Sequence, residues 1–313
     1  MNYPRIFERV YLNPVCVSAE RFASIHAFLL PRLTGKAPLE LHAAGQDFNQ
    51  RKTRSPYNAK RSQRAAPVVN PMTGAIIDPR FYTSPMPGVA VVPVYGVLAK
   101  NLSAWEEDCG GGTDINAPME ALRQALAAPE IQKIALDMDS PGGEVTGIPE
   151  FASAIAAAAQ VKRVEAFTDA GACSACYWLA SQCSAFHVTR SSTVGSVGTY
   201  LAWLDESIKM ELEGVALQLF AAGKHKGIGL PGRPLSTDDR ALLQARVDRI
   251  NGWFTSSVQH GRAQALCVAD IAEVIDPACL EGQTFSGEQA IENGMADSIV
   301  SGWDEFLERF AAA

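Results

Sequence analysis

From residue 88 onward, continuous apolar runs alternate with stretches in which apolar residues recur at helical spacing. The stretch GVAVVPVYGVL (88–98) is a continuous β-branched run, which is typical of a buried strand. In 114–130, apolar residues return at helical spacing, at Met119, Leu122 and Leu126. The same reasoning predicts strands at 131–138, 161–169 and 185–189, and helices at 145–160 and after residue 174. Strands that alternate with helices of this length predict an α/β fold with a mostly parallel sheet.

Two regions precede this pattern. Residues 1–45 predict a small helical leader, because apolar residues recur at helical spacing after a capping Ser18. The stretch GQDFNQRKTRSPYNAKRSQRAAP (45–67) carries six basic residues and one acid without periodicity. Residues 46–87 are therefore expected to form a basic flexible linker or a propeptide, with a docking segment for an acidic partner as the alternative. The α/β region takes residues 88–313.

A long helix is predicted over STDDRALLQARVDRINGWFTSSVQHGRA (236–263), capped by Ser236 or Thr237. Its apolar side chains recur at helical spacing and predict core packing: Leu242, Val247, Ile250 and Phe254.

Composition narrows the class of protein. Of the 313 residues, 47% are hydrophobic and 19% are charged, which is typical of a soluble globular protein. The net charge of −7 argues against nucleic acid as the main ligand. No stretch approaches the roughly 18 apolar residues of a membrane span, and no signal peptide pattern opens the chain. We therefore expect a cytoplasmic protein.

Seven cysteines, an odd number, do not suggest a secreted disulfide framework. Cys173 and Cys176 form a C-x-x-C motif, which is typical of a redox pair or of half a zinc site. No second motif of this kind accompanies it, so we expect no metal and interpret these residues as small buried thiols.

One candidate nucleophile lies in AGACSACYWLAS (170–181), where Ser174 follows a predicted strand. The stretch DSPGG (139–143) follows another strand, and the carboxyl ends of parallel strands meet at one edge of a sheet. Gly142 and Gly143 leave backbone amides unobstructed, as an oxyanion hole requires. The pattern indicates either a serine nucleophile or an ordinary helix start.

The residues alone leave the base for such a serine open. The five histidines are at 26, 42, 187, 225 and 260, and His187 lies inside a predicted strand as a core or edge residue. The stretch GKHKGIG (223–229) follows a predicted strand at 214–220 and carries Lys224, His225 and Lys226. A desolvated lysine is able to serve as a general base.

Six stretches, in order, resemble motifs of the serine–lysine peptidases of the signal peptide peptidase A family. They are VAVVPVYGVL, DSPGGEV, SACYWLAS, STVGSVGTY, GKHKGIG and GQTFSGEQAIENGMAD, and they span about two thirds of the chain. The resemblance implies a ClpP/crotonase-like fold, a spiral of ββα units, with the peptidase domain over 88–313. It also implies a serine endopeptidase that needs no cofactor, acts on polypeptides and forms a homo-oligomer.

The resemblance assigns roles to individual residues. Ser174 falls on the nucleophile, Lys226 on the general base, and Ser196 on the serine that helps to orient this lysine. Gly143 or its neighbour Gly142, with the amide of Ala175, falls on the oxyanion hole. Where ClpP-like enzymes place a histidine, this chain has Thr199. Cys173 and Cys176 depart from the small residues usual around the nucleophile, and we expect a changed pocket with the chemistry retained.

The opening of the chain resembles the leader of phage and prophage capsid-assembly proteases of the minor capsid protein C type. This resemblance implies cleavage of scaffold or capsid proteins, or of the chain itself, within the phage prohead. Three alternatives stand beside it: a bacterial signal-peptide-peptidase-like protease, a crotonase-type acyl-CoA enzyme with Glu144 as the available carboxylate, and a structural pseudoenzyme.

Overall fold

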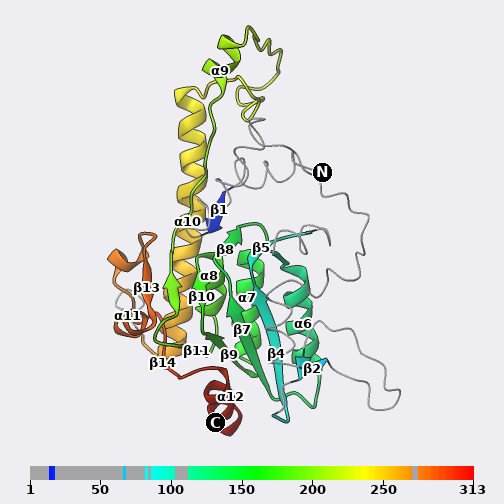
Figure 1. The fold of residues 1–313 in the computed structure, drawn as a ribbon, viewed down its shortest axis with the longest axis vertical. Helices are drawn as coiled ribbons and strands as arrows, with labels where there is room; N and C mark the ends of the chain where they lie inside the picture. The colour runs from blue at the N-terminus through cyan, green and yellow to red at the C-terminus, as the bar shows by residue number, and fades with distance from the viewer. Residues whose placement is uncertain (1–13, 18–65, 68–81, 84–85, 103–111, 270–273) are drawn as a thin grey trace, which may run out of the picture. The chain divides into compact units, whose positions relative to one another are not determined.

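The computed structural model describes residues 14–17, 66–67, 82–83, 86–102, 112–269 and 274–313. Its largest sheet has seven strands (Figure 1). Their order is β14 (Ser298–Ile299), β11 (Ala185–Val188), β9 (Arg163–Thr168), β7 (Lys133–Asp139), β4 (Val89–Tyr95), β3 (Tyr82–Thr83) and β2 (Ala66–Pro67). The five strands from β14 to β4 are parallel, and β3 and β2 are antiparallel. The predicted α/β fold with a mostly parallel sheet is therefore confirmed.

Short second strands form two smaller sheets. One has the order β1 (Val15–Val17), β8 (Gly142–Glu144), β5 (Val97–Ala99) and β6 (Gly112–Asp114). The other has the order β10 (Gly171–Cys173), β12 (Thr193–Gly195) and β13 (Thr284–Ser286). A strand of the large sheet, a short strand and a helix thus repeat along the chain, as in β7–β8–α7 and β9–β10–α8, which agrees with the expected ββα units.

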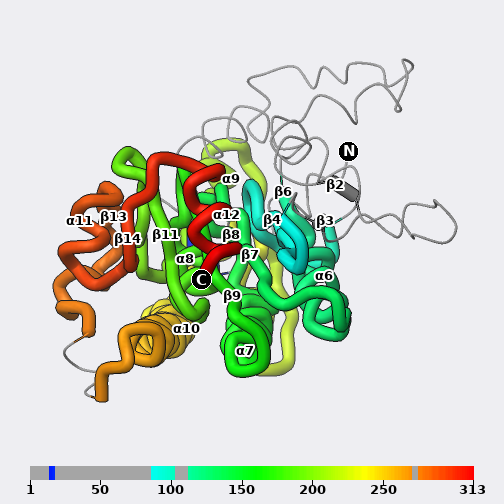
Figure 2. The backbone as a smooth tube through the Cα atoms, turned by 90° about the horizontal axis from the view of Figure 1, so that it is seen from below, coloured from blue at the N-terminus to red at the C-terminus, as the bar shows by residue number. Residues whose placement is uncertain are grey.

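Three helices cover one face of the large sheet: α6 (Asn116–Ala127), α7 (Ile148–Ala159) and α8 (Ala175–Ala180). Successive side chains of a strand point to opposite faces, so Val92 and Val94 of β4 join this core. Val89 and Val91 instead contact α12 (Trp303–Ala312) on the other face. Figure 2 shows α12, in red, separated from α7 by β9. Both faces of the sheet are buried, which explains its continuous apolar strands.

The closing segment of the chain contains a 3-10 turn, η3 (Pro277–Leu280), and α11 (Gly287–Glu292). Ser286 caps α11 with a capping box, in which its hydroxyl accepts a hydrogen bond from the amide of Gln289. The terminal helix α12 is held at its end by Lys133, whose Nζ donates to the carbonyl oxygens of Phe310 and Ala311, 2.8 Å from each.

The chain divides into two compact units: residues 1–15 with 199–253, and residues 16–198 with 254–313. In the first unit, α9 (Ser207–Leu212) is followed by a stretch that the sequence predicts as a strand, 214–220. This prediction is wrong. Residues 215–220 have no regular secondary structure and are exposed, and none of the described strands pairs with them. An apolar run without a ladder partner does not form a sheet.

The predicted long helix is α10 (Thr237–Leu266), and Ser236 is its cap. The amide of Asp239 donates to Ser236 Oγ at 3.1 Å. The predicted core packing is confirmed for Ile250 and Phe254, which are buried. It is wrong for the first turns of the helix, where Leu242 is 46% exposed.

The predicted leader helix lies outside the described residues, as do most of residues 46–87. Within these two regions the structure describes β1, β2 and β3. In the described part of the chain, no helix is long and apolar enough to cross a membrane.

Candidate active site

Ser174 lies at a sharp turn between β10 and α8. Its backbone has φ 55° and ψ −121°, a conformation that residues other than glycine adopt rarely. The amide of Ser174 donates to the carbonyl oxygen of Gly195 at 2.7 Å, and its own carbonyl accepts from the amide of Trp178 at 2.9 Å. A strained strand-to-helix turn of this kind is where several hydrolase folds place a nucleophile.

The hydroxyl of Ser174 is buried and unpartnered. The residue is 1% exposed, and within the described part of the chain its Oγ has no hydrogen-bond partner. Leaving a buried hydroxyl unpaired costs about 1–3 kcal/mol, so such a group calls for an explanation beyond packing. A nucleophile that waits for a base and a substrate supplies one.

The glycine turn 140–143 is held beside β10 by Ser140. The amide of Ser140 donates to the carbonyl oxygen of Gly171 at 2.7 Å, and the Ser140 carbonyl accepts from the amide of Cys173 at 3.0 Å. The Ser140 hydroxyl donates to the carbonyl oxygen of Gly96 at 2.6 Å and accepts from the amide of Gly142 at 3.1 Å. Sequence reasoning missed Ser140, although a polar residue between a buried strand and a glycine pair was a usable signal.

Gly142 lies against Ser174. Its φ is +102°, and a methyl group on it would lie 2.9 Å from Cβ of Ser174 and 3.0 Å from the amide nitrogen of Ala175, and would collide with the carbonyl oxygen of Cys16. A methyl group on Gly143 would collide with the carbonyl oxygen of Leu98. The structure therefore brings the predicted Gly142, Ser174 and Ala175 together at one point.

Ser196 follows the residue that binds the Ser174 amide. It has φ 53°, is 7% exposed, and its amide donates to the carbonyl oxygen of Gln283 at 2.7 Å. Because β10 pairs with β12 so that Cys173 lies opposite Gly195, the Ser196 turn is adjacent to the Ser174 turn. The two predicted serines thus share one region of the second unit.

The thiols beside Ser174 are buried. Cys176 is fully buried, and this burial raises the pKa of its thiol well above the usual value, so it stays protonated. Cys173 is 4% exposed, and its thiol lies 3.5 Å from the carbonyl oxygen of Thr193. Both are therefore small buried thiols, as the sequence predicts. Among the described residues, no group of three or more His, Cys, Asp or Glu is arranged to hold a metal ion.

Lys226 belongs to the first unit, on a loop anchored by Asp239. Asp239 is 1% exposed; its Oδ1 lies 2.9 Å from Nδ1 of His225, and its Oδ2 accepts from Arg233 at 2.8 Å. The hydrogen bond from His225 leads the interactions that lower the pKa of Asp239 to about 2. Lys226 itself is exposed. Ser174 and Lys226 lie in different units, and their pairing stays a prediction.

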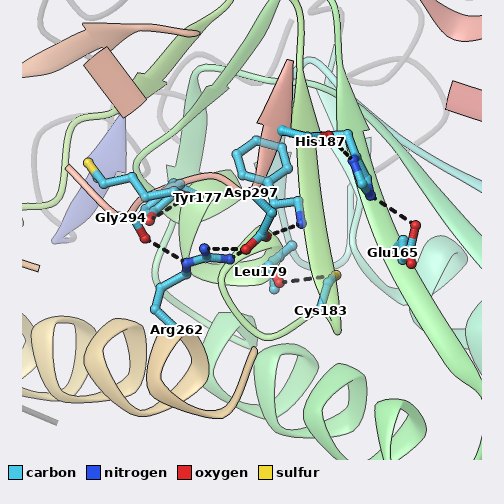
Figure 3. Close-up of polar contacts among 11 residues, drawn as sticks. Glu165, Tyr177, Leu179, Cys183, His187, Arg262, Gly294 and Asp297 are labelled. Atoms are coloured by element: carbon cyan, nitrogen blue, oxygen red, sulfur yellow. Dashed lines mark hydrogen bonds and ion pairs between the residues drawn. The ribbon is translucent and has the colours of Figure 1, made fainter. Parts of the chain in front are cut away.

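Two described histidines share a unit with Ser174, and both have other partners. The ring of His187 lies 2.9 Å from Glu165 Oε2 through Nε2 and 2.7 Å from Ser298 Oγ through Nδ1 (Figure 3). Nδ1 of His260 lies 2.7 Å from the carbonyl oxygen of Ser256. His26 and His42 lie outside the described residues.

A buried ion pair joins α10 to the segment that precedes β14 and lies near Tyr177 of α8 (Figure 3). Arg262 of α10 is fully buried and binds both carboxylate oxygens of Asp297 at 2.8 Å, while its Nε donates to the carbonyl oxygen of Gly294 at 2.9 Å. Burial alone would raise the pKa of Asp297, but the hydrogen bonds from Arg262 outweigh it and hold this pKa below its ordinary value. In α8, the Tyr177 hydroxyl donates to the carbonyl oxygen of Met295 at 3.0 Å.

Comparison with known proteins agrees with this geometry. Peptidase family S49 matches residues 156–313, just over half of the chain and the part that contains Ser174, Ser196 and Lys226. The chain belongs to peptidase family S49. The expected resemblance and the ClpP/crotonase-like fold class are thereby confirmed, and family S49 membership favours a peptidase over a crotonase-type enzyme.

Members of family S49 from phages are among the relatives of this chain. Capsid assembly protease C of Escherichia phage lambda is 35% identical over 219 residues, which cover 70% of this chain and 48% of that protein. Head-tail preconnector protein GP5 of Enterobacteria phage P21 is 31% identical over 217 residues, covering 69% and 42%. A putative signal peptide peptidase SppA of Enterococcus faecium is 27% identical over 175 residues, covering 54% and 47%. The chain spans less than half the length of each.

Proposed function

We propose that the chain is a serine endopeptidase in which Ser174 is the nucleophile and Lys226 the general base. The observation that carries this proposal is the strained, buried turn at Ser174, whose hydroxyl has no partner in the described part of the chain and lies beside Gly142 and Ala175. Membership of family S49 supports it.

The proposed reaction has two halves. Uncharged Lys226 takes the proton of Ser174 Oγ as this oxygen attacks the substrate carbonyl carbon, and the amides of Ala175 and Gly143 stabilise the oxyanion. Of the two predicted glycines Gly143 is preferred, because the amide of Gly142 already donates to Ser140 Oγ. The C–N bond then breaks, and the Lys226 ammonium gives its proton to the leaving amine. In the second half, Lys226 takes a proton from water as the water oxygen attacks the ester carbonyl carbon. The bond between this carbon and Ser174 Oγ then breaks, the Lys226 ammonium returns its proton to Oγ, and the carboxylic acid leaves. Ser196 is proposed to help orient the lysine.

The names of the phage relatives support a particular setting. We infer that the chain cleaves scaffold or capsid proteins, or itself, during phage head maturation, inside a prohead assembled in the cytoplasm. The lambda relative, a capsid assembly protease, and the P21 head-tail preconnector protein suggest this role.

We also propose that the working form is a homo-oligomer. A lysine acts as a base only when it is uncharged, and desolvation favours that form. Lys226 is exposed within this chain. Nearby in sequence, large apolar side chains are exposed as well, among them Ile208 at 71%, Leu212 at 84% and Phe220 at 94%. A second copy that covers these residues would bury their apolar surface and would also remove Lys226 from contact with water.

The test is an intact-mass time course of the purified full chain, alone and with β-casein as an unfolded polypeptide. Wild type should cut itself or casein, whereas Ser174→Ala and Lys226→Ala should lower the rate by roughly 10³-fold or more, as loss of a nucleophile or base does in serine peptidases. Ser153→Ala on α7 and Lys224→Ala, two positions from Lys226, are the matched controls and should cleave like wild type. If Lys226→Ala cleaves as fast as wild type, Lys226 is not the general base, and the histidines become the candidates for this role.

A further inference from the structure

We propose that β1 occupies the position of an extended polypeptide substrate at Ser174, so that the chain carries a substrate-like segment of its own. The proposal rests on the proposed function, since it takes Ser174 to be the nucleophile. It identifies residues 15–17 as the occupant.

The first support is the place of β1 in its sheet. β1 is the neighbour of β8, at the end of the order β1–β8–β5–β6, and β8 begins with the two glycines of the site (Figure 1). Without β1, β8 would be an edge strand with unpaired backbone groups beside the nucleophile. An extended peptide binds such an edge through main-chain hydrogen bonds that do not depend on its sequence.

The second support is the closeness of β1 to the reacting groups. The carbonyl oxygen of Cys16 lies against Cα of Gly142, where an added methyl group would collide with it. The same methyl group would lie 2.9 Å from Cβ of Ser174 and 3.0 Å from the amide nitrogen of Ala175. A main-chain carbonyl of β1 thus converges with the nucleophile and with one proposed oxyanion donor.

The third support is burial. Val15, Cys16 and Val17 are 5%, 0% and 7% exposed, and Ser174 beside them is 1% exposed. A substrate cannot reach a hydroxyl that is covered in this way. Access to Ser174 therefore requires β1 to leave, and β1 and a substrate would compete for one edge.

The side chain of Cys16 is closely packed, which helps to hold β1 beside β8. It is fully buried and belongs to the same hydrophobic cluster as Leu98, Ala175 and Cys176. Closely packed surroundings of this kind admit a small apolar side chain and disfavour a charged or large one. On the other flank, Val15 exchanges two main-chain hydrogen bonds with Tyr200, at 3.0 and 3.2 Å, as a bound peptide strand would.

The first experiment measures access to Ser174 in the full chain with a fluorophosphonate, which modifies reactive serine hydroxyls. Cys16→Glu places a charge in the buried position and should release β1, raising the labelling rate of Ser174 roughly tenfold or more, as expected when a state that is closed nine tenths of the time opens. Cys267→Glu makes the same change at an exposed cysteine and should label like wild type. Equal rates in all three proteins would overturn the proposal.

The second measurement does not depend on catalysis or on a variant that folds. The peptide PVCVSA, which reproduces residues 14–19, is added to the wild-type chain, and alkylation of each cysteine by iodoacetamide is followed by mass spectrometry. We expect the peptide to displace β1 and to raise alkylation at Cys16 severalfold while Cys176 stays protected. The scrambled peptide CSVAPV is the control.

The two measurements separate this proposal from the proposed function. If the peptide exposes Cys16 but no variant reacts with the fluorophosphonate at Ser174, the self-bound strand is supported and the nucleophile assignment fails. If Ser174 is labelled but neither Cys16→Glu nor the peptide changes anything, the self-bound strand is refuted and the peptidase proposal stands.

Discussion

Ser174 combines a left-handed backbone, burial and a hydroxyl without a partner in the described part of the chain. The left-handed backbone and the buried, unpaired hydroxyl each cost free energy. Ser174 lowers the stability of the fold and is central to the proposed reaction. Its substitution should therefore raise the stability of the protein and lower its activity.

We therefore expect Ser174→Ala to abolish cleavage and yet to raise the free energy of unfolding by about 1 kcal/mol, because a buried unpaired hydroxyl is removed. Urea unfolding of the full chain measures this. Ser181→Ala in the same region is the matched control: its buried hydroxyl donates to the carbonyl oxygen of Trp178 at 2.8 Å, so its loss should destabilise the protein. A Ser174→Ala variant that is less stable than wild type would contradict the description of an unpaired hydroxyl.

Single residues were predictable from the sequence only where they belong to a local motif. Ser174, Gly142 and Gly143 were found because each follows an apolar strand within a short characteristic stretch. Ser140 was missed because its partner, the carbonyl of Gly96, lies 44 positions away and becomes visible only in the fold. The burial of the Ser174 hydroxyl could not be foreseen for the same reason.

At the scale of elements, the pair Arg262–Asp297 joins α10 to the segment that precedes β14. Asp297 also accepts a hydrogen bond from the amide of Phe186 at 2.6 Å, at the neighbouring strand β11. A buried charge that loses its partner keeps the cost of its desolvation. The pair should therefore matter for the stability of the whole second unit, although it contacts neither Ser174 nor its glycines.

We expect Arg262→Ala to lower the free energy of unfolding by about 3–5 kcal/mol, as the loss of one partner of a buried ion pair does. Arg309→Ala, which removes an exposed partner of Glu305, is the control and should change little. Chemical unfolding monitored by tryptophan fluorescence measures both.

The same pair gives a dependence on pH. The pKa of Asp297 is lowered in the folded state, so the pair stabilises the fold above the ordinary carboxyl pKa of 3.8. This contribution is lost as the pH falls through the lowered folded-state pKa. Asp297→Asn should be less stable than wild type at neutral pH and should approach it on acidification; a constant difference would show that the carboxylate charge is not involved.

Elements with local periodicity were predictable, and the strand at 214–220 shows the limit. Between residues 88 and 189, the strands of the large sheet and the helices α6, α7 and α8 were predicted because each shows an apolar run or a helical period. The short strands β6, β8 and β10 were not predicted, because three residues are too few to show a period. The run GVALQLF has the composition of a strand as well, but a strand also needs a partner, and composition does not say whether one exists. Likewise, the apolar stripe of α10 extends to Leu242, which the described chain does not cover.

At the scale of the whole molecule, the exposed apolar residues of the first unit are the feature that a single chain leaves unexplained. Ile208, Leu212 and Phe220 are each more than 70% exposed within residues 208–220. Exposed apolar residues that are this close together in a sequence are typical of a surface that binds a partner. The expected homo-oligomer follows from the family resemblance, and these residues indicate where its contacts would lie.

We expect the purified chain to sediment as an assembly that Phe220→Glu and Leu212→Glu shift toward the monomer, because each places a charge on the surface that we propose is covered by a second copy. Val161→Glu, at a position 70% exposed in the second unit, is the matched control and should leave the sedimentation coefficient unchanged. A wild-type chain that is monomeric at micromolar concentration would count against the proposed oligomer and against the proposal that a second copy desolvates Lys226.

The crowding around Gly142 also limits how this sequence can vary over generations. The codons for glycine and alanine differ by one base, so the smallest possible side-chain addition needs only one base change. At Gly252 and Gly302 that addition meets nothing within 4 Å. At Gly142 it would collide with the carbonyl oxygen of Cys16 and crowd both Cβ of Ser174 and the amide nitrogen of Ala175. The space around the first two positions therefore admits an alanine, whereas an alanine at the third would disturb the turn that holds Ser174.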